Sequence, residues 1–150
     1  MANCLRNILK KKSPKYYDKF DHIKNECKDI LPKIGIPFPE CTDHNVKHAE
    51  NVEKIIERLI PDDVKKSLNH EEIFCLLSAV WLHDIGKTLD NTKRFKNAET
   101  YEKEKIKRIT RDLHHIRSYN FIKNNSAFKL NYREAEANNR YHRKNTERTR

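Results

Sequence analysis

The most apolar segment of the chain, residues 76–82 with the sequence LLSAVWL, runs directly into a histidine and an aspartate, His83 and Asp84. A buried carboxylate is costly unless it is paired or binds a cation. Near the end of a helix it also faces the negative end of the helix dipole. A metal ion held by both side chains would offset these costs. The competing reading is that Asp84 points to solvent or pairs with Lys87.

A second histidine stands at helical spacing in another segment. His48, Val52, Ile55 and Leu59 share one stripe of a predicted helix, which indicates that His48 faces the core. His44 lies one turn earlier on the same side and is a possible joint ligand. A core histidine that binds no metal is the alternative.

Further candidates lie at and after the doublet. The motif HHIRS, residues 114–118, offers His114 as a ligand and His115 as a neighbouring or substrate-contacting group. His142 is the last candidate, with a tail histidine as its alternative. Lys87, one turn beyond the doublet, can hold a phosphate charge or be an ordinary helix-end lysine.

Imidazole and carboxylate ligands without thiolate suit Zn, Mn, Fe, Ni or Co. Such an ion lowers the pKa of bound water and polarises a phosphoryl oxygen. The residue types therefore indicate a metal ion that can activate water and bind a phosphoryl oxygen.

Helices are expected to position these groups, because the chain has only two glycines. That number argues against a glycine-rich phosphate loop and against a sheet with many tight turns. Residues 71–85 are apolar all round, which predicts a central buried helix ending in His-Asp, with Gly86 as its C-terminal cap. The other predicted helices are 16–31, 42 or 43 to 60, about 98–123 with a break near residue 114, and 132–141.

The remaining segments are read as loops and termini. Prolines predict a loop over residues 31–40, and residues 88–97 read as polar and irregular. Residues 1–15 are expected to be a basic, frayed leader, and 145–150 a basic tail. The all-α domain is therefore placed at residues 16–144.

Composition limits the function further. Hydrophobic and charged residues each make up 36%, so the core must come from a few concentrated apolar faces. The net charge of +10 suggests weak nucleic-acid binding through a basic surface, or simply a solvated basic surface. No apolar run approaches the ~20 residues of a membrane helix. Four scattered cysteines without a C-x-x-C pair predict reduced thiols and a cytoplasmic protein.

Taken together, these motifs resemble the HD-domain superfamily of metal-dependent phosphohydrolases. The segments TDHNVKHAENV (42–52), LSAVWLHDIGK (77–87) and RDLHHIRSYNFI (111–122) are most similar to HD domains joined to an Hsp90-like ATPase domain. The resemblance implies an all-α, HD-type helical bundle that hydrolyses a phosphoester, often in a nucleotide.

The resemblance also implies a set of site residues and one or two divalent ions per chain, of Mn, Fe, Ni, Co, Zn or Mg. The implied metal ligands are His48, His83, Asp84, His114 and His142. The implied catalytic groups are Asp84, Lys87 and His115, with Lys87 facing the phosphate. Which of the two neighbouring histidines is the ligand stays open.

One departure from the family pattern leaves alternatives. The pattern ends in an aspartate ligand, and this chain has no aspartate after Asp112. Either the chain is a piece of a longer protein with a further C-terminal domain, or Glu134 or Glu136 substitutes. The third reading is a catalytically weak regulatory or partner-binding module.

Overall fold

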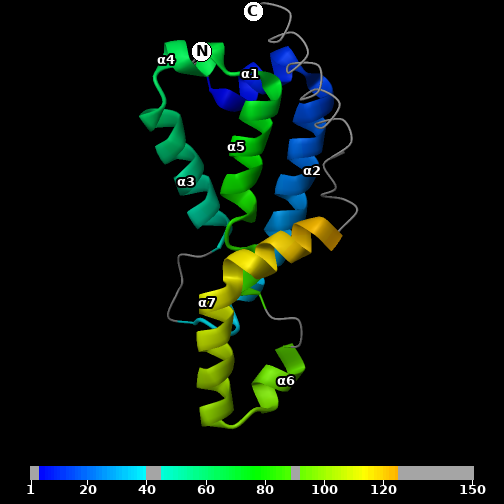
Figure 1. The fold of residues 1–150 in the computed structure, drawn as a ribbon, viewed down its shortest axis with the longest axis vertical. Coiled ribbons are helices and arrows are strands. Elements are labelled where there is room, and N and C mark those ends of the chain that lie inside the picture. Colours follow the sequence, from blue (N-terminus) through cyan, green and yellow to red (C-terminus); the bar gives the residue numbers. More distant parts are fainter. Residues whose placement is uncertain (1–3, 40–44, 89–91, 125–150) are drawn as a thin grey trace, which may run out of the picture.

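The protein is an all-α bundle in the computed structural model, which describes residues 4–39, 45–88 and 92–124 (Figure 1). No strand occurs within these ranges, which confirms the predicted fold class. None of the helices in them has both the length and the apolar character that crossing a bilayer requires. The elements are α1 (Leu5–Lys12), α2 (Pro14–Ile30), the 3-10 helix η1 (Leu31–Gly35), α3 (Val46–Leu59), α4 (Asp62–Ser67), α5 (His70–Leu82), the 3-10 helix η2 (Ile85–Lys87), α6 (Thr92–Asn97) and α7 (Thr100–Asn124).

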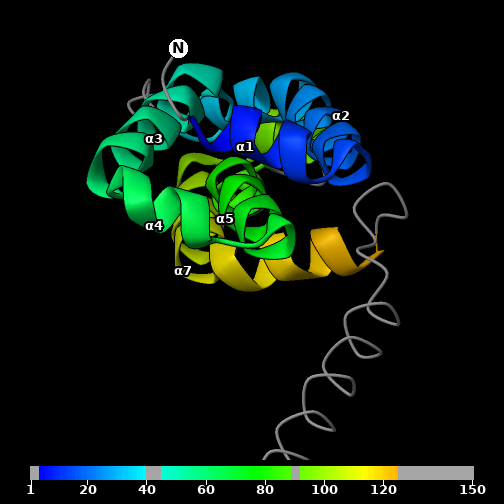
Figure 2. The ribbon, with the colours of Figure 1, turned by 90° about the horizontal axis from the view of Figure 1, so that it is seen from above.

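Helix α5 is the central element, as its sequence predicts. It lies between α2 and α3 in the view of Figure 1 and below α1 in that of Figure 2, and it contacts all three helices. Asn69 starts it with a capping box, in which the Asn69 side chain accepts from the Glu72 N–H at 2.9 Å and the Glu72 carboxylate accepts from the Asn69 N–H at 2.8 Å. Its buried residues include Phe74, Leu77 and Trp81. This cap and this burial fix the direction in which α5 delivers its C-terminal end.

The N-terminal segment is a helix and not the frayed leader that its charge suggests. Helix α1 buries Leu5 and Leu9 completely in the core, while its lysines face outward. Ser13 then starts α2, with Pro14 in the first turn. The two leucines are four residues apart and share one helical face, so a short amphipathic helix forms despite the high local charge.

Helix α3 presents a different face to the core from the predicted stripe. Ile55 and Leu59 are 52% and 73% exposed, whereas Ala49 and Glu53 are buried. Glu53 accepts hydrogen bonds from the Arg6 guanidinium and from the Trp81 indole N–H, the latter at 2.9 Å. The core side of α3 therefore carries a paired carboxylate. The helix is rotated about its axis relative to the orientation that its apolar residues alone predict.

Other segments expected to be irregular contain helical turns. Residues 31–40 include η1, which buries Leu31 and Ile34, and residues 88–97 include α6, which buries Phe95. Helix α7 is hydrogen-bonded through the predicted break, although it changes direction along its length (Figure 1). The predicted helix 132–141 lies outside the described residues.

Candidate metal centre

The histidine-aspartate doublet lies directly after α5, at the junction with η2. The helix ends at Leu82, three residues earlier than predicted, and His83 is its C-terminal cap. Asp84 follows with a side chain only 4% exposed, whereas the His83 side chain is 41% exposed. The predicted glycine cap is wrong, because Gly86 lies in η2 and has no positive φ.

Gly86 is needed for another reason, which is the close approach of α7. A Cβ at this position would lie 2.0 Å from the backbone oxygen of His114 and 2.6 Å from the backbone nitrogen of Ser118. Any side chain here would push α7 away from the turn that carries the doublet.

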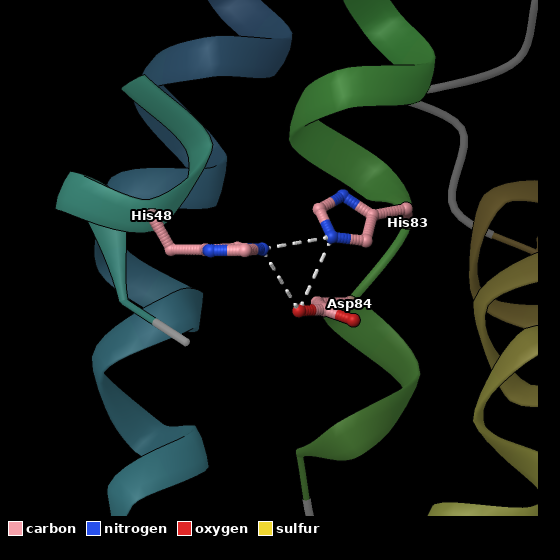
Figure 3. A group of neighbouring side chains, drawn as sticks. All are labelled: His48, His83 and Asp84. Atoms are coloured by element: carbon pink, nitrogen blue, oxygen red, sulfur yellow. Dashed lines mark hydrogen bonds and ion pairs between the residues drawn. The ribbon is translucent and has the colours of Figure 1, made fainter. Parts of the chain in front are cut away.

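Three side chains, one from α3 and two from the turn after α5, converge here (Figure 3). His48 Nε2 lies 3.3 Å from His83 Nε2 and 3.7 Å from Asp84 Oδ2, and His83 Nε2 lies 3.2 Å from the same carboxylate oxygen. Asn45 positions His48 by capping α3, since its side chain accepts from the Lys47 and His48 N–H groups at 2.9 and 3.4 Å. These two imidazoles and one carboxylate can hold a metal ion.

Hydrogen bonding determines which nitrogen of His83 faces the cluster. Its Nδ1 lies 2.8 Å from the Val80 carbonyl oxygen, which can only accept, so Nδ1 carries the proton. In the neutral ring, Nε2 therefore directs its lone pair toward Asp84. The hydrogen bond to Asp84 raises the pKa of the His83 imidazole above its usual value, and burial opposes this shift. The carboxylate that attracts a proton here would equally attract a metal ion.

Lys87 joins the same carboxylate from the other side. Its Nζ lies 2.8 Å from Asp84 Oδ1, while Oδ2 faces the histidines. The pairing of Asp84 with Lys87, an alternative to metal binding at the sequence level, is thus present in the structure. It does not exclude a metal ion, because the two partners use different oxygens of the carboxylate.

The later histidines are not part of this cluster within the described residues. His114 Nδ1 donates to the Arg111 carbonyl oxygen at 2.7 Å, and the rings of His114 and His115 meet edge to face. Their roles as ligand and substrate group stay predictions. His44 and His142, as well as Glu134 and Glu136, lie outside the described residues.

The motif HHIRS supplies two residues that a search for ligands overlooks. Ser118 and Arg117 hydrogen-bond to the backbone of residues 83–88, through the carbonyl oxygens of His83, Gly86 and Thr88 and the N–H of Gly86. Only their place beside the paired histidines singles them out in the sequence.

Comparison with known proteins agrees with this geometry. The family model HD-CE matches residues 38–147, which include His48, His83, Asp84 and the HHIRS motif. It supports an HD-type domain and leaves the association with an Hsp90-like domain a prediction. No curated protein and no solved structure matches the chain. Because the match covers most of its length, the chain belongs to the HD-CE family and carries an HD-type domain.

Proposed function

We propose that this protein is a metal-dependent phosphohydrolase that cleaves a phosphoester in a nucleotide or a related small molecule. The observation that carries the proposal is the convergence of His48 Nε2 from α3 with His83 Nε2 and Asp84 Oδ2 from the turn after α5, all within 4.8 Å of one another. Two nitrogen donors and one oxygen donor suit Mn, Fe, Co, Ni or Zn. Membership of an HD-type family supports the same chemistry.

The residues of the site have separable roles in this proposal. His48, His83 and Asp84 would hold the ion, which when bound supplies an activated water and polarises the phosphoryl oxygen. Asp84 carries the negative charge of the site, with Lys87 beside one of its oxygens and His83 beside the other. We assign Lys87 to the phosphate, because its ammonium group stands beside the carboxylate and its side chain keeps 15% of its surface exposed.

Phosphate release from nucleoside phosphates and cyclic nucleotides tests this function, in the presence of Mn²⁺, Co²⁺ or Ni²⁺. Asp84→Asn preserves the shape of the side chain and removes its charge, so we expect loss of at least about 100-fold in turnover. Asp112→Asn is the matched control, since Asp112 is exposed on α7. Equal turnover in the two variants would exclude the assigned site.

A catalytically weak, regulatory module is the second candidate. It is favoured by the ion pair of Lys87 with Asp84, which offsets the charge of the buried carboxylate without any metal ion. This candidate predicts a folded protein that binds metal weakly and releases no phosphate from any substrate above the rate of Asp84→Asn.

A further inference from the structure

The turn that carries the doublet is tied to α7 by four hydrogen bonds to its backbone. The Gly86 N–H donates to Ser118 Oγ at 2.9 Å, and the same hydroxyl donates to the His83 carbonyl oxygen at 3.1 Å. Arg117 Nε donates to the Gly86 carbonyl oxygen at 2.8 Å, and its Nη2 donates to the Thr88 carbonyl oxygen at 2.6 Å. Two adjacent residues of α7 thus bind both ends of the turn. We call this pair the α7 clamp.

The clamp supplies hydrogen-bond partners to backbone groups of the turn, which lie beyond the regular hydrogen-bonding pattern of α5. A carbonyl at the end of a helix lacks an intrahelical donor, and an unpaired polar group in the interior is costly. Ser118 is 5% exposed and Gly86 is buried, so water has little access to the contact. The serine hydroxyl acts as acceptor and donor together, which alanine cannot do.

The position of the clamp has a consequence for the metal centre. His83 and Asp84 have short side chains, so the positions of Nε2 and Oδ2 follow the backbone to which the clamp binds. The ring of His83 is further tied to α5 through Val80. A shift of the turn away from α7 would therefore separate the two donors from His48, which is held by a different helix.

From these contacts we infer that Arg117 and Ser118 are positioning residues for the metal centre. Docking of α7 and metal binding are then coupled, and by linkage each strengthens the other. This inference rests on the proposed metal site. The competing explanation is that Ile85, 1% exposed in the core, and the Lys87–Asp84 pair hold the turn by themselves, with the clamp contributing to stability alone.

The test compares Ser118→Ala and Arg117→Lys with Arg108→Lys, an exposed arginine on the same helix. Arg117→Lys keeps the charge but loses the fork that reaches two carbonyl groups. Two quantities are measured on each folded protein: amide hydrogen exchange over residues 83–88 without metal, and the dissociation constant for Co²⁺ by calorimetry. We expect faster exchange and binding about 10- to 100-fold weaker in both clamp variants, with Arg108→Lys like the unmodified chain.

Each outcome decides a separate claim. Unchanged exchange in both clamp variants would overturn the inference without touching the proposed function. Faster exchange with an unchanged dissociation constant would also overturn it, because the clamp would then be purely structural. If the unmodified chain binds no Co²⁺, the proposed function fails together with the metal half of the inference, and hydrogen exchange alone decides whether the clamp positions the turn. Should Ser118→Ala not fold, Arg117→Lys carries the test.

Discussion

Replacing Gly86 by alanine perturbs the contact between α7 and the metal centre in the most direct way. The added Cβ would lie 2.0 Å from the His114 carbonyl oxygen, so the helix must retreat by about 1.4 Å to reach the 3.4 Å of ordinary contact. The atoms in the way are mainly backbone, which cannot rotate aside as a flexible side chain can.

The cost has two parts that can be weighed from the structure. Overpacking a tight contact costs about 1–3 kcal/mol, and weakening the four hydrogen bonds of the α7 clamp adds about 0.5–1 kcal/mol for each bond. We therefore expect the free energy of unfolding to fall by about 3–7 kcal/mol, which lowers the melting temperature by roughly 10–20 °C in a chain of this size.

Circular dichroism at rising temperature measures this effect, and the second glycine of the chain provides the control. A Cβ at Gly35 would meet nothing within 4 Å, so Gly35→Ala is expected to be neutral or stabilising by about 0.4–1 kcal/mol. If Gly86→Ala has the same melting temperature as the unmodified chain, the close packing of α7 against the turn is refuted.

Three further predictions concern buried or paired groups. Lys87→Met should strengthen Co²⁺ binding about tenfold, because removing the ammonium group beside the site relieves about 1.4 kcal/mol of charge repulsion. The same variant should lower turnover. Weaker Co²⁺ binding, measured by calorimetry, would contradict this prediction. Burial raises the pKa of the Cys27 thiol to about 12, so its contribution to the free energy of unfolding is intact below about pH 9 and falls above it. Between pH 7 and pH 10, the free energy of unfolding measured in urea should therefore fall by about 1.4 kcal/mol less in Cys27→Ala than in the unmodified chain. Equal falls in the two proteins would exclude the effect. Glu53→Gln should lower the free energy of unfolding in urea by about 2 kcal/mol and shift the fluorescence of Trp81, because the carboxylate accepts hydrogen bonds from the Trp81 indole and from Arg6. An unchanged urea midpoint would show that this buried network is dispensable.

The sequence predicts much of the fold because strong local signals agree. The apolar run before His83 indicates a central helix, and Asn69 with two acids marks its start. These two features depend on residue type and spacing within one segment, which a single sequence displays directly. The sequence also places His48 on the core side of its helix, and the structure brings it beside the doublet, although Ile55 and Leu59 of the predicted stripe are exposed.

Other features depend on contacts between distant segments and could not be predicted. The buried face of α3 includes Glu53 because Arg6, 47 residues earlier, pairs with it. The need for a glycine at position 86 arises from α7, and no turn geometry reveals it. Arg117 and Ser118 read as an ordinary polar helix face until the backbone that they bind is known.

The high charge of the N-terminal segment also led to a wrong prediction for α1. The lysines of residues 10–12 suggest a solvated leader, yet Leu5 and Leu9 are completely buried in α1. A helix of this length gains its stability from packing and not from its own propensity, so its sequence carries a weak signal.

The metal content of the purified protein tests the central claim most directly. The chain is purified without chelator, reconstituted with Mn²⁺, Co²⁺ or Ni²⁺, and analysed by inductively coupled plasma mass spectrometry beside Asp84→Ala and the control Asp112→Ala. Ions that are retained by the unmodified chain and by Asp112→Ala, but lost from Asp84→Ala, are the result that we predict. No retained ion after reconstitution, or equal retention in all three proteins, would contradict a metal centre built by His48, His83 and Asp84.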